Sequence, residues 1–169
     1  MREAMNAYYA SESHTPIALA IAALVLVVGV FLVLRRKGLA RGLGWTFIVF
    51  GALVGIGAAV YSVQLLRTIA HYDDLLTRDP VAYKTEELAH IHGVTSRFVG
   101  IRLFDVALAV VGAAIALYAQ RRRRRTTQGV GIGIAVHGLL LFALESRNAA
   151  HAQTYEAHLV DFTPPTPPR

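Results

Sequence analysis

Histidine is the residue type whose number and spacing in this sequence offer the most chemistry. Six of the seven histidines fall outside the long apolar stretches, and besides His14 they are the candidate metal ligands His71, His90, His92, His151 and His158. Imidazoles combined with carboxylates and no thiolate suit Zn²⁺ or Cu²⁺, and the chain contains no Cys. If the segments that carry these histidines fold as neighbouring helices, three of the rings can converge on one Zn or Cu ion. The alternative is that they are solvated histidines on a polar surface.

Two charged residues and one histidine fall inside the apolar stretches: Arg102, Asp105 and His137. Ionisable groups within a membrane are costly, and they often mark a path for protons or ions. Asp105 and His137 are expected at similar depth, so they form a proton or ion site if they face each other. The alternative is local: Arg102 pairs with Asp105 one turn away, close to water, and His137 is a packing residue.

Motifs for other chemistry are absent from the sequence. There is no phosphate-binding glycine loop followed by Lys, no His-Glu-x-x-His and no nucleophilic Ser elbow. Glu87 and His90 have the Glu-x-x-His spacing of di-iron bundles, but such a site needs a second copy and further carboxylates. Haem held by two facing histidines is not expected, because His137 alone lies deep. The sequence favours a protein that is not an enzyme and predicts no cofactor beyond the Zn or Cu alternative.

Four long apolar stretches must position these residues. They run over about 16–34, 43–66, 99–120 and 127–144. Each is close to the ~20 residues that a helix needs to cross the hydrocarbon core of a bilayer. The chain is 54% hydrophobic and 17% charged, and soluble domains are about 25% charged. We therefore predict an all-α integral membrane protein, a four-transmembrane-helix bundle with extracytoplasmic helical extensions.

Two connections between these stretches are strongly basic and contain no acid. The first holds Arg35, Arg36, Lys37 and Arg41, and the second holds Arg121, Arg122, Arg123, Arg124 and Arg125. By the positive-inside rule both connections stay in the cytoplasm, which puts both termini on the periplasmic side of a bacterial inner membrane. The second cluster is also expected to bind anionic lipid headgroups. Because the net charge of +6 arises from these loops, we expect no nucleic-acid partner.

Four segments are predicted to lie outside the membrane on the periplasmic side. They are a tail over 1–15, a loop helix over about 80–92, an extension of the fourth helix over about 145–162 and a proline-rich disordered tail over 163–169. The loop helix is bracketed by Asp79-Pro80 and Gly93, which are typical start and stop signals. We expect it to lie on or near the membrane surface.

Small residues repeat along three of the apolar stretches, and they are predicted to form the helix contacts. The candidate packing residues are Gly51, Gly55, Ser62, Gly112, Gly129 and Gly133. Helices in lipid associate through small residues because no hydrophobic force drives them together. These faces predict a tight four-helix bundle.

Taken together, the sequence favours a small structural or accessory subunit of the bacterial inner membrane. Its partners are expected to be the lipid bilayer and other membrane-protein subunits, or a second copy of the chain, engaged through the outer cap. The alternative is a membrane metalloprotein, or a transport or redox component, that uses the outer histidines or the Asp105 and His137 pair.

Overall fold

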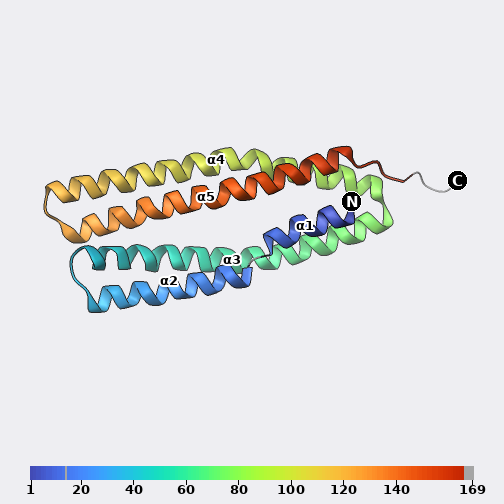
Figure 1. Cartoon of the computed structure of the whole chain (residues 1–169). Helices are drawn as coiled ribbons and strands as arrows, with labels where there is room; N and C mark the ends of the chain where they lie inside the picture. The colour runs from blue at the N-terminus through green and yellow to red at the C-terminus, as the bar shows by residue number, and fades with distance from the viewer. Residues whose placement is uncertain (14, 166–169) are drawn as a thin grey trace.

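The computed structural model describes residues 1–13 and 15–165, and these form five α-helices joined by short connections (Figure 1). The helices are α1 (Arg2–Glu12), α2 (Thr15–Arg35), α3 (Leu39–Arg78), α4 (Pro80–Arg121) and α5 (Arg125–Asp161). The last four are long and apolar enough to cross a membrane. The predicted all-α fold with four apolar helices is therefore confirmed.

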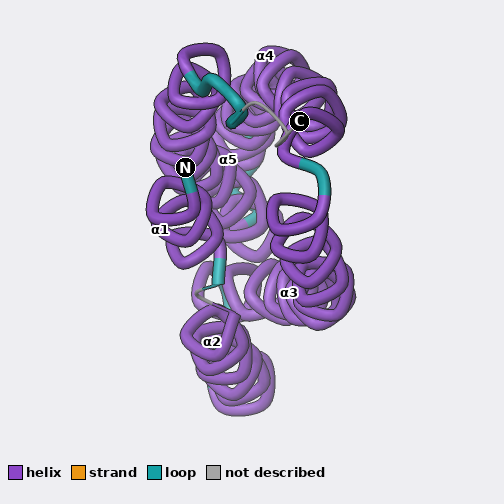
Figure 2. Tube along the Cα trace, turned by 90° about the vertical axis from the view of Figure 1, so that its right-hand side faces the viewer, coloured by secondary structure: helices purple, strands orange, loops and turns teal. Residues whose placement is uncertain are grey.

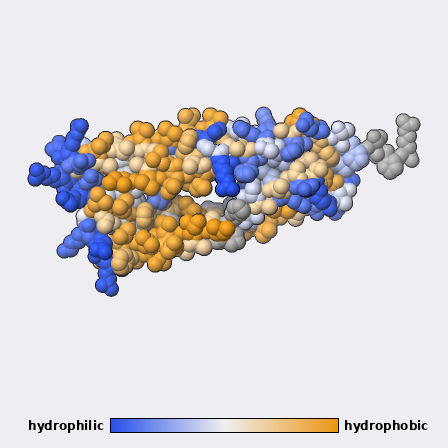
Figure 3. Space-filling view, viewed as in Figure 1, coloured by the Kyte–Doolittle hydropathy of each residue, from blue (hydrophilic) through white to orange (hydrophobic). Residues whose placement is uncertain are grey.

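The two ends of the molecule differ in their surface chemistry. Both basic connections lie at one end, and the N-terminus, the α3–α4 turn and the end of α5 lie at the other (Figure 1). Figure 3 shows an apolar belt between a hydrophilic basic end and an opposite end of mixed polarity. We call this mixed end the cap and define it as residues 1–13, 65–98 and 145–165.

The cap departs from the prediction between the second and third apolar stretches. Residues 80–92 do not form a separate surface helix, because α4 continues from Pro80 to Arg121 as a single helix of 42 residues. The start of α4 follows the expected rule: Asp79 Oδ1 accepts hydrogen bonds from the backbone N–H groups of Val81 and Ala82 at 3.1 and 3.0 Å.

Gly93 does not end the helix as the sequence suggested. Ile91 and Phe98, on either side of it, are both buried in the cap, so continuing the helix places two large apolar side chains in the core. A glycine inside a helix costs only about 1 kcal/mol relative to alanine, and burying one such side chain contributes more than that. Tertiary packing therefore overrides the local stop signal.

The N-terminal segment is a helix rather than the expected tail over 1–15. α1 is stabilised by three side chains on one face, Met5, Tyr8 and Tyr9, which are 0%, 7% and 4% exposed in the cap. At the other end of the chain, α5 continues without a break to Asp161, and residues 162–165 are not helical. Residues 166–169 of the predicted tail lie outside the described part of the chain.

The helices do not form a closed bundle. α4 packs along α5, α5 packs on α3, and α2 lies on the far side of α3 (Figure 2). Within the described residues, α2 makes extensive contact with α3 alone. The composition of α2 explains this, because Gly29 is the residue that lets it approach α3 closely, against Gly44, and much of the rest is large and aliphatic.

Glycines stand at the closest helix crossings. A Cβ added to Gly112 would lie 2.7 Å from the carbonyl oxygen of Gly131, where α4 meets α5. A Cβ on Gly129 would overlap the carbonyl of Leu39, and one on Gly133 would overlap the hydroxyl of Thr46. The α3–α5 and α4–α5 contacts therefore leave no room for a side chain at these positions.

The remaining candidate packing residues lie on α3, and their surroundings differ. A Cβ on Gly51 would come within 3.0 Å of the Leu26 side chain on α2, and one on Gly55 would make an ordinary contact of 3.5 Å with Ala22. Ser62 turns back to its own helix, where its hydroxyl donates to the carbonyl oxygen of Ala59 at 2.8 Å.

Candidate functional site

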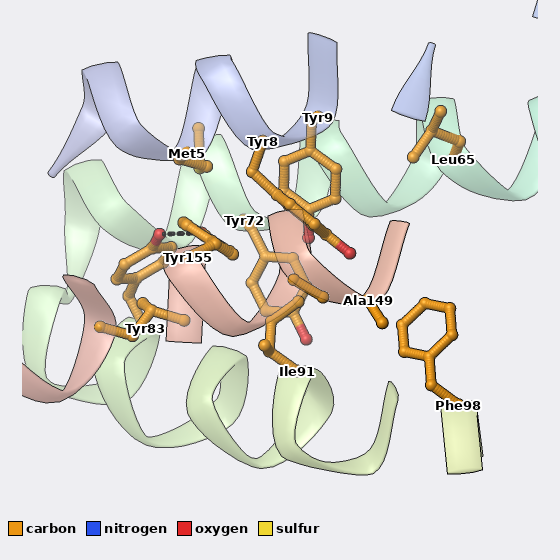
Figure 4. Packing of buried hydrophobic residues seen from close by; sticks show 12 residues of the cluster. Met5, Tyr8, Tyr9, Leu65, Tyr72, Tyr83, Ile91, Phe98, Ala149 and Tyr155 are labelled. Carbon is orange, nitrogen blue, oxygen red and sulfur yellow. Dashed lines mark hydrogen bonds between the residues drawn. The ribbon is translucent and has the colours of Figure 1, made fainter. Parts of the chain in front are cut away.

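The main core of buried apolar residues lies in the cap (Figure 4). Four helices, α1, α3, α4 and α5, contribute to it: Met5, Tyr8, Tyr9, Leu65, Tyr72, Tyr83, Ile91, Phe98, Ala149, Ala152, Tyr155 and Leu159. Large apolar side chains are thus buried together in the cap, whereas most of those along the apolar belt are exposed.

A carboxyl group is enclosed in this core. Glu87 of α4 is 0% exposed, and its Oε1 accepts hydrogen bonds from the hydroxyls of Tyr9 at 2.7 Å and Tyr155 at 3.0 Å. The hydroxyls of Tyr155 and Tyr83 are themselves hydrogen-bonded at 2.8 Å. Glu87 Oε2 is buried and has no hydrogen-bond partner among the described residues.

The surroundings of Glu87 decide its protonation. Burial raises the pKa of this carboxyl from 4.5 to about 7, even though the hydrogen bonds from Tyr9 and Tyr155 lower it. Burial also raises the pKa of both tyrosines well above the ordinary value, so they remain donors at every physiological pH. Glu87 is thus a fully buried carboxyl whose pKa lies near neutral pH.

Aromatic stacking joins α1 to this group. The Tyr8 ring stacks on the Tyr155 ring with centroids 4.5 Å apart and an interplanar angle of 7°. The Tyr9 ring meets the same Tyr155 ring edge-on at 6.2 Å. Offset or edge-on aromatic pairs contribute about 0.5–1.5 kcal/mol beyond their buried area. Tyr155 of α5 therefore contacts both α1 and the Glu87 carboxyl.

α1 is also held near both of its ends. Arg2 forms an ion pair with Asp73 of α3 at 3.2 Å and donates to the Thr77 hydroxyl at 2.6 Å. Toward the other end, the Tyr61 hydroxyl of α3 donates to the carboxylate of Glu12. The Arg2 pair is half exposed, so its contribution to stability is small. These contacts position α1 as a cover over Glu87.

The polar residues predicted inside the membrane do not form one site. The His137 ring bonds through Nδ1 to the carbonyl of Gly133 at 2.8 Å and stacks on Phe50 of α3, with centroids 4.3 Å apart. Asp105 is 2% exposed and lies where α4 meets α5, and its Oδ2 has no partner among the described residues. His137 therefore points toward α3, and no hydrogen bond joins it to Asp105 in the described structure.

The outer histidines are likewise separate. His71 pairs with Glu86 at 3.4 Å and His92 with Glu156 at 2.9 Å, both on the surface of the cap. His90 lies beside the Tyr72 ring at 5.7 Å, and His151 and His158 are exposed. In the described part of the chain no three His, Cys, Asp or Glu side chains come together as a metal site.

The second basic cluster is fully solvent-facing. Arg121, Arg122, Arg123, Arg124 and Arg125 are all exposed at the end of the molecule opposite the cap. The Arg122 guanidinium lies over the Tyr118 ring at 5.7 Å from its centroid. This places a concentrated positive surface where the apolar belt ends, which is the geometry that contact with lipid headgroups requires.

A groove of about 530 Å³ crosses the surface of the cap between α4 and α5. Its apolar lining comes from Leu88, Ala89 and Val160, and Val160 is 56% exposed. The Lys84 ammonium on its edge donates to the backbone carbonyls of Val160 and Phe162 at 2.8 and 2.6 Å, which ties the end of α5 to α4. These contacts hold the end of α5 against α4 beside the groove.

Sequence reasoning missed the Glu87 cluster. In the sequence Glu87 stands out only as half of an incomplete metal motif. A usable signal was the distribution of tyrosine: five of the seven, Tyr8, Tyr9, Tyr72, Tyr83 and Tyr155, belong to the cap core. Buried tyrosines need a hydrogen-bond acceptor, and that need points to an acid among them.

Comparison with known proteins adds no information about the site. No family model, curated protein or solved structure matches the chain. The function proposed below therefore depends on the residues and their geometry alone.

Proposed function

We propose that the protein is a small accessory subunit of the bacterial inner membrane and that its cap engages a partner membrane protein on the periplasmic side. In this orientation the basic connections are cytoplasmic and both termini are periplasmic, as the distribution of Arg and Lys favours. Activity as an enzyme is not part of the proposal.

One observation carries the proposal. Three apolar helices continue without a break into a packed cap, and the ionisable carboxyl at the centre of that cap is shielded from solvent. α3, α4 and α5 are 40, 42 and 37 residues long, which is about twice the length needed to cross the hydrocarbon core. Glu87, the one fully buried carboxyl in the cap core, is 0% exposed and lies beneath α1. A rigid platform with a closed interior suits binding of a partner better than turnover of a substrate.

The groove between α4 and α5 supports this proposal and indicates the chemistry of the partner. Its apolar lining is exposed to water rather than to lipid, because it lies beyond the apolar belt in the cap. Apolar surface left in water is typical of binding sites. We expect an extramembrane segment of the partner to insert apolar side chains there, against Leu88, Ala89 and Val160.

The test is purification of the tagged full chain from its native membrane in mild detergent. We expect a second membrane protein at a fixed stoichiometry that stays bound through size-exclusion chromatography. Val160→Glu should release it, whereas Val81→Glu, at a cap valine that is also 56% exposed but outside the groove, should retain it.

Two results would contradict the proposal. One is a monodisperse single chain that carries a bound metal or a visible cofactor. The other is a partner retained equally by both glutamate variants while their thermal unfolding matches that of the parent. A second copy of the chain in place of a different protein would change the partner but leave the role of the groove intact.

A further inference from the structure

An arginine lies at the cap end of the apolar belt without an acidic partner. Arg102 Nε donates to the carbonyl oxygen of Phe98 at 3.2 Å, and in the described chain no carboxylate lies within 4.0 Å of its guanidinium. Asp105, one turn along α4, is buried against α5 instead. The terminal N–H groups of the Arg102 guanidinium therefore have no partner of opposite charge within the described residues.

This side chain lines a groove of about 240 Å³. It is lined by Val99, Arg102, Leu103 and Val106 of α4 and by Phe142 of α5. Apart from Arg102 the lining is aliphatic or aromatic, and all four of these apolar residues are exposed. The groove combines one cation with an apolar path that extends about 6 Å from Arg102 to Val106 at 1.5 Å per residue.

The depth of Arg102 matches the position of lipid phosphates. It precedes Arg121, at the basic end of α4, by 19 residues, which corresponds to roughly 28 Å along the helix. The hydrocarbon core of a bilayer is about 30 Å thick. If the basic end lies at one interface, the guanidinium reaches the other interface, and Leu103, Val106 and Phe142 lie on the hydrocarbon side of it.

We propose that Arg102 binds the phosphate of an anionic phospholipid in the cap-side leaflet, with the start of one acyl chain in the groove. A guanidinium matches a phosphate with two parallel hydrogen bonds, and this pairing strengthens where water is scarce. A zwitterionic lipid brings its own cation next to the phosphate, so the site favours a lipid without one. The proposal rests on the apolar belt being embedded in a bilayer and is independent of any partner at the cap.

The test uses quenching of a single tryptophan by brominated acyl chains in vesicles. The full-length chain carries Trp45→Phe, which removes the sole native indole, together with Phe142→Trp in the groove. Vesicles of phosphatidylcholine contain a small fraction of brominated phosphatidylglycerol or, in a parallel series, the same fraction of brominated phosphatidylcholine. We expect a roughly fivefold preference for the anionic lipid, the size typical of one arginine near a charged lipid surface.

Three comparisons make the result decisive. Leu140→Trp, at a residue of α5 that is 57% exposed and outside the groove, should show no preference between the two lipids. Arg102→Gln should remove the preference at position 142, and Arg102→Lys should keep part of it, with helicity checked by circular dichroism. The Arg102→Lys protein keeps the test valid if the Gln variant does not fold.

Equal quenching by both lipids at position 142 would overturn the proposal. So would a preference that survives Arg102→Gln, because other arginines would then be concentrating the anionic lipid. Absence of quenching at position 140 by either lipid would show that α5 is not embedded, which is a different failure from loss of lipid preference.

Discussion

Raising the pH through neutrality is expected to loosen α1, and Glu87→Gln is expected to abolish that effect. The reason is the enclosed carboxyl, whose pKa is about 7 in the folded cap and 4.5 ordinarily. Between these values the unfolded chain has lost its proton while the folded cap retains it. The contribution of protonated Glu87 to the stability of the cap is therefore complete below about pH 4.5. It decreases as the pH rises and is lost above about pH 7.

The size of the effect follows from the two pKa values. The rise from 4.5 to about 7 corresponds to about 3 kcal/mol of unfolding free energy at ~1.4 kcal/mol for each pKa unit. Burial also raises the pKa of a second cap carboxyl, Glu145. His90 acts in the opposite sense, because burial, with a smaller effect of Arg97, lowers its pKa and makes its protonation unfavourable in the folded state. The comparison with Glu87→Gln cancels these contributions.

Hydrogen exchange of the α1 amides, followed by mass spectrometry, measures this local stability. Parent and Glu87→Gln proteins are compared at each pH between 5 and 8, so that the intrinsic pH dependence of exchange cancels. We expect protection of α1 in the parent to decrease relative to the variant as the pH rises. Parallel curves, or a relative gain of protection with rising pH, would refute the assigned role of Glu87.

Three further outcomes follow from the same geometry. Tyr155→Phe should lower the unfolding free energy of the cap by about 1–3 kcal/mol, because it removes the hydrogen bonds to Glu87 and Tyr83. Tyr118→Phe, at an exposed ring, should leave the unfolding free energy unchanged. Gly129→Ala should destabilise the helix assembly by about 1–3 kcal/mol through overlap with Leu39, and Gly57→Ala, with nothing within 4 Å, should be neutral. Elemental analysis of protein purified after Zn and Cu supplementation should give less than stoichiometric metal; one tightly bound ion per chain would contradict the separation of the histidines.

The sequence predicted the four apolar helices because length and composition alone identify a helix that is apolar enough to cross a bilayer. It also predicted the start of α4, since Asp79 and Pro80 act locally and their effect does not depend on distant residues. The stop at Gly93 was wrong for the opposite reason. Burial of Ile91 and Phe98 depends on α1, α3 and α5, and a local signal carries no information about those contacts.

The cap site was beyond sequence reasoning for a similar physical reason. Tyr9, Glu87 and Tyr155 are separated by 78 and 68 residues, so their hydrogen bonds depend on how three helices rotate about their axes. The same rotation decides that His137 points toward Phe50 on α3. Helical periodicity places a residue at a depth along the helix, but it leaves the direction of the side chain open when apolar residues surround it.

The central claim, a cap on the periplasmic side carried by membrane-crossing helices, is tested most directly by thiol labelling. The chain has no Cys, so Thr163→Cys in the cap or Thr126→Cys next to the basic cluster introduces the sole thiol. On intact spheroplasts, a membrane-impermeant maleimide should label the Thr163→Cys protein, and it should label the Thr126→Cys protein only after the membrane is opened. Labelling of the Thr126→Cys protein alone on intact spheroplasts would contradict the orientation and with it the proposed function of the cap.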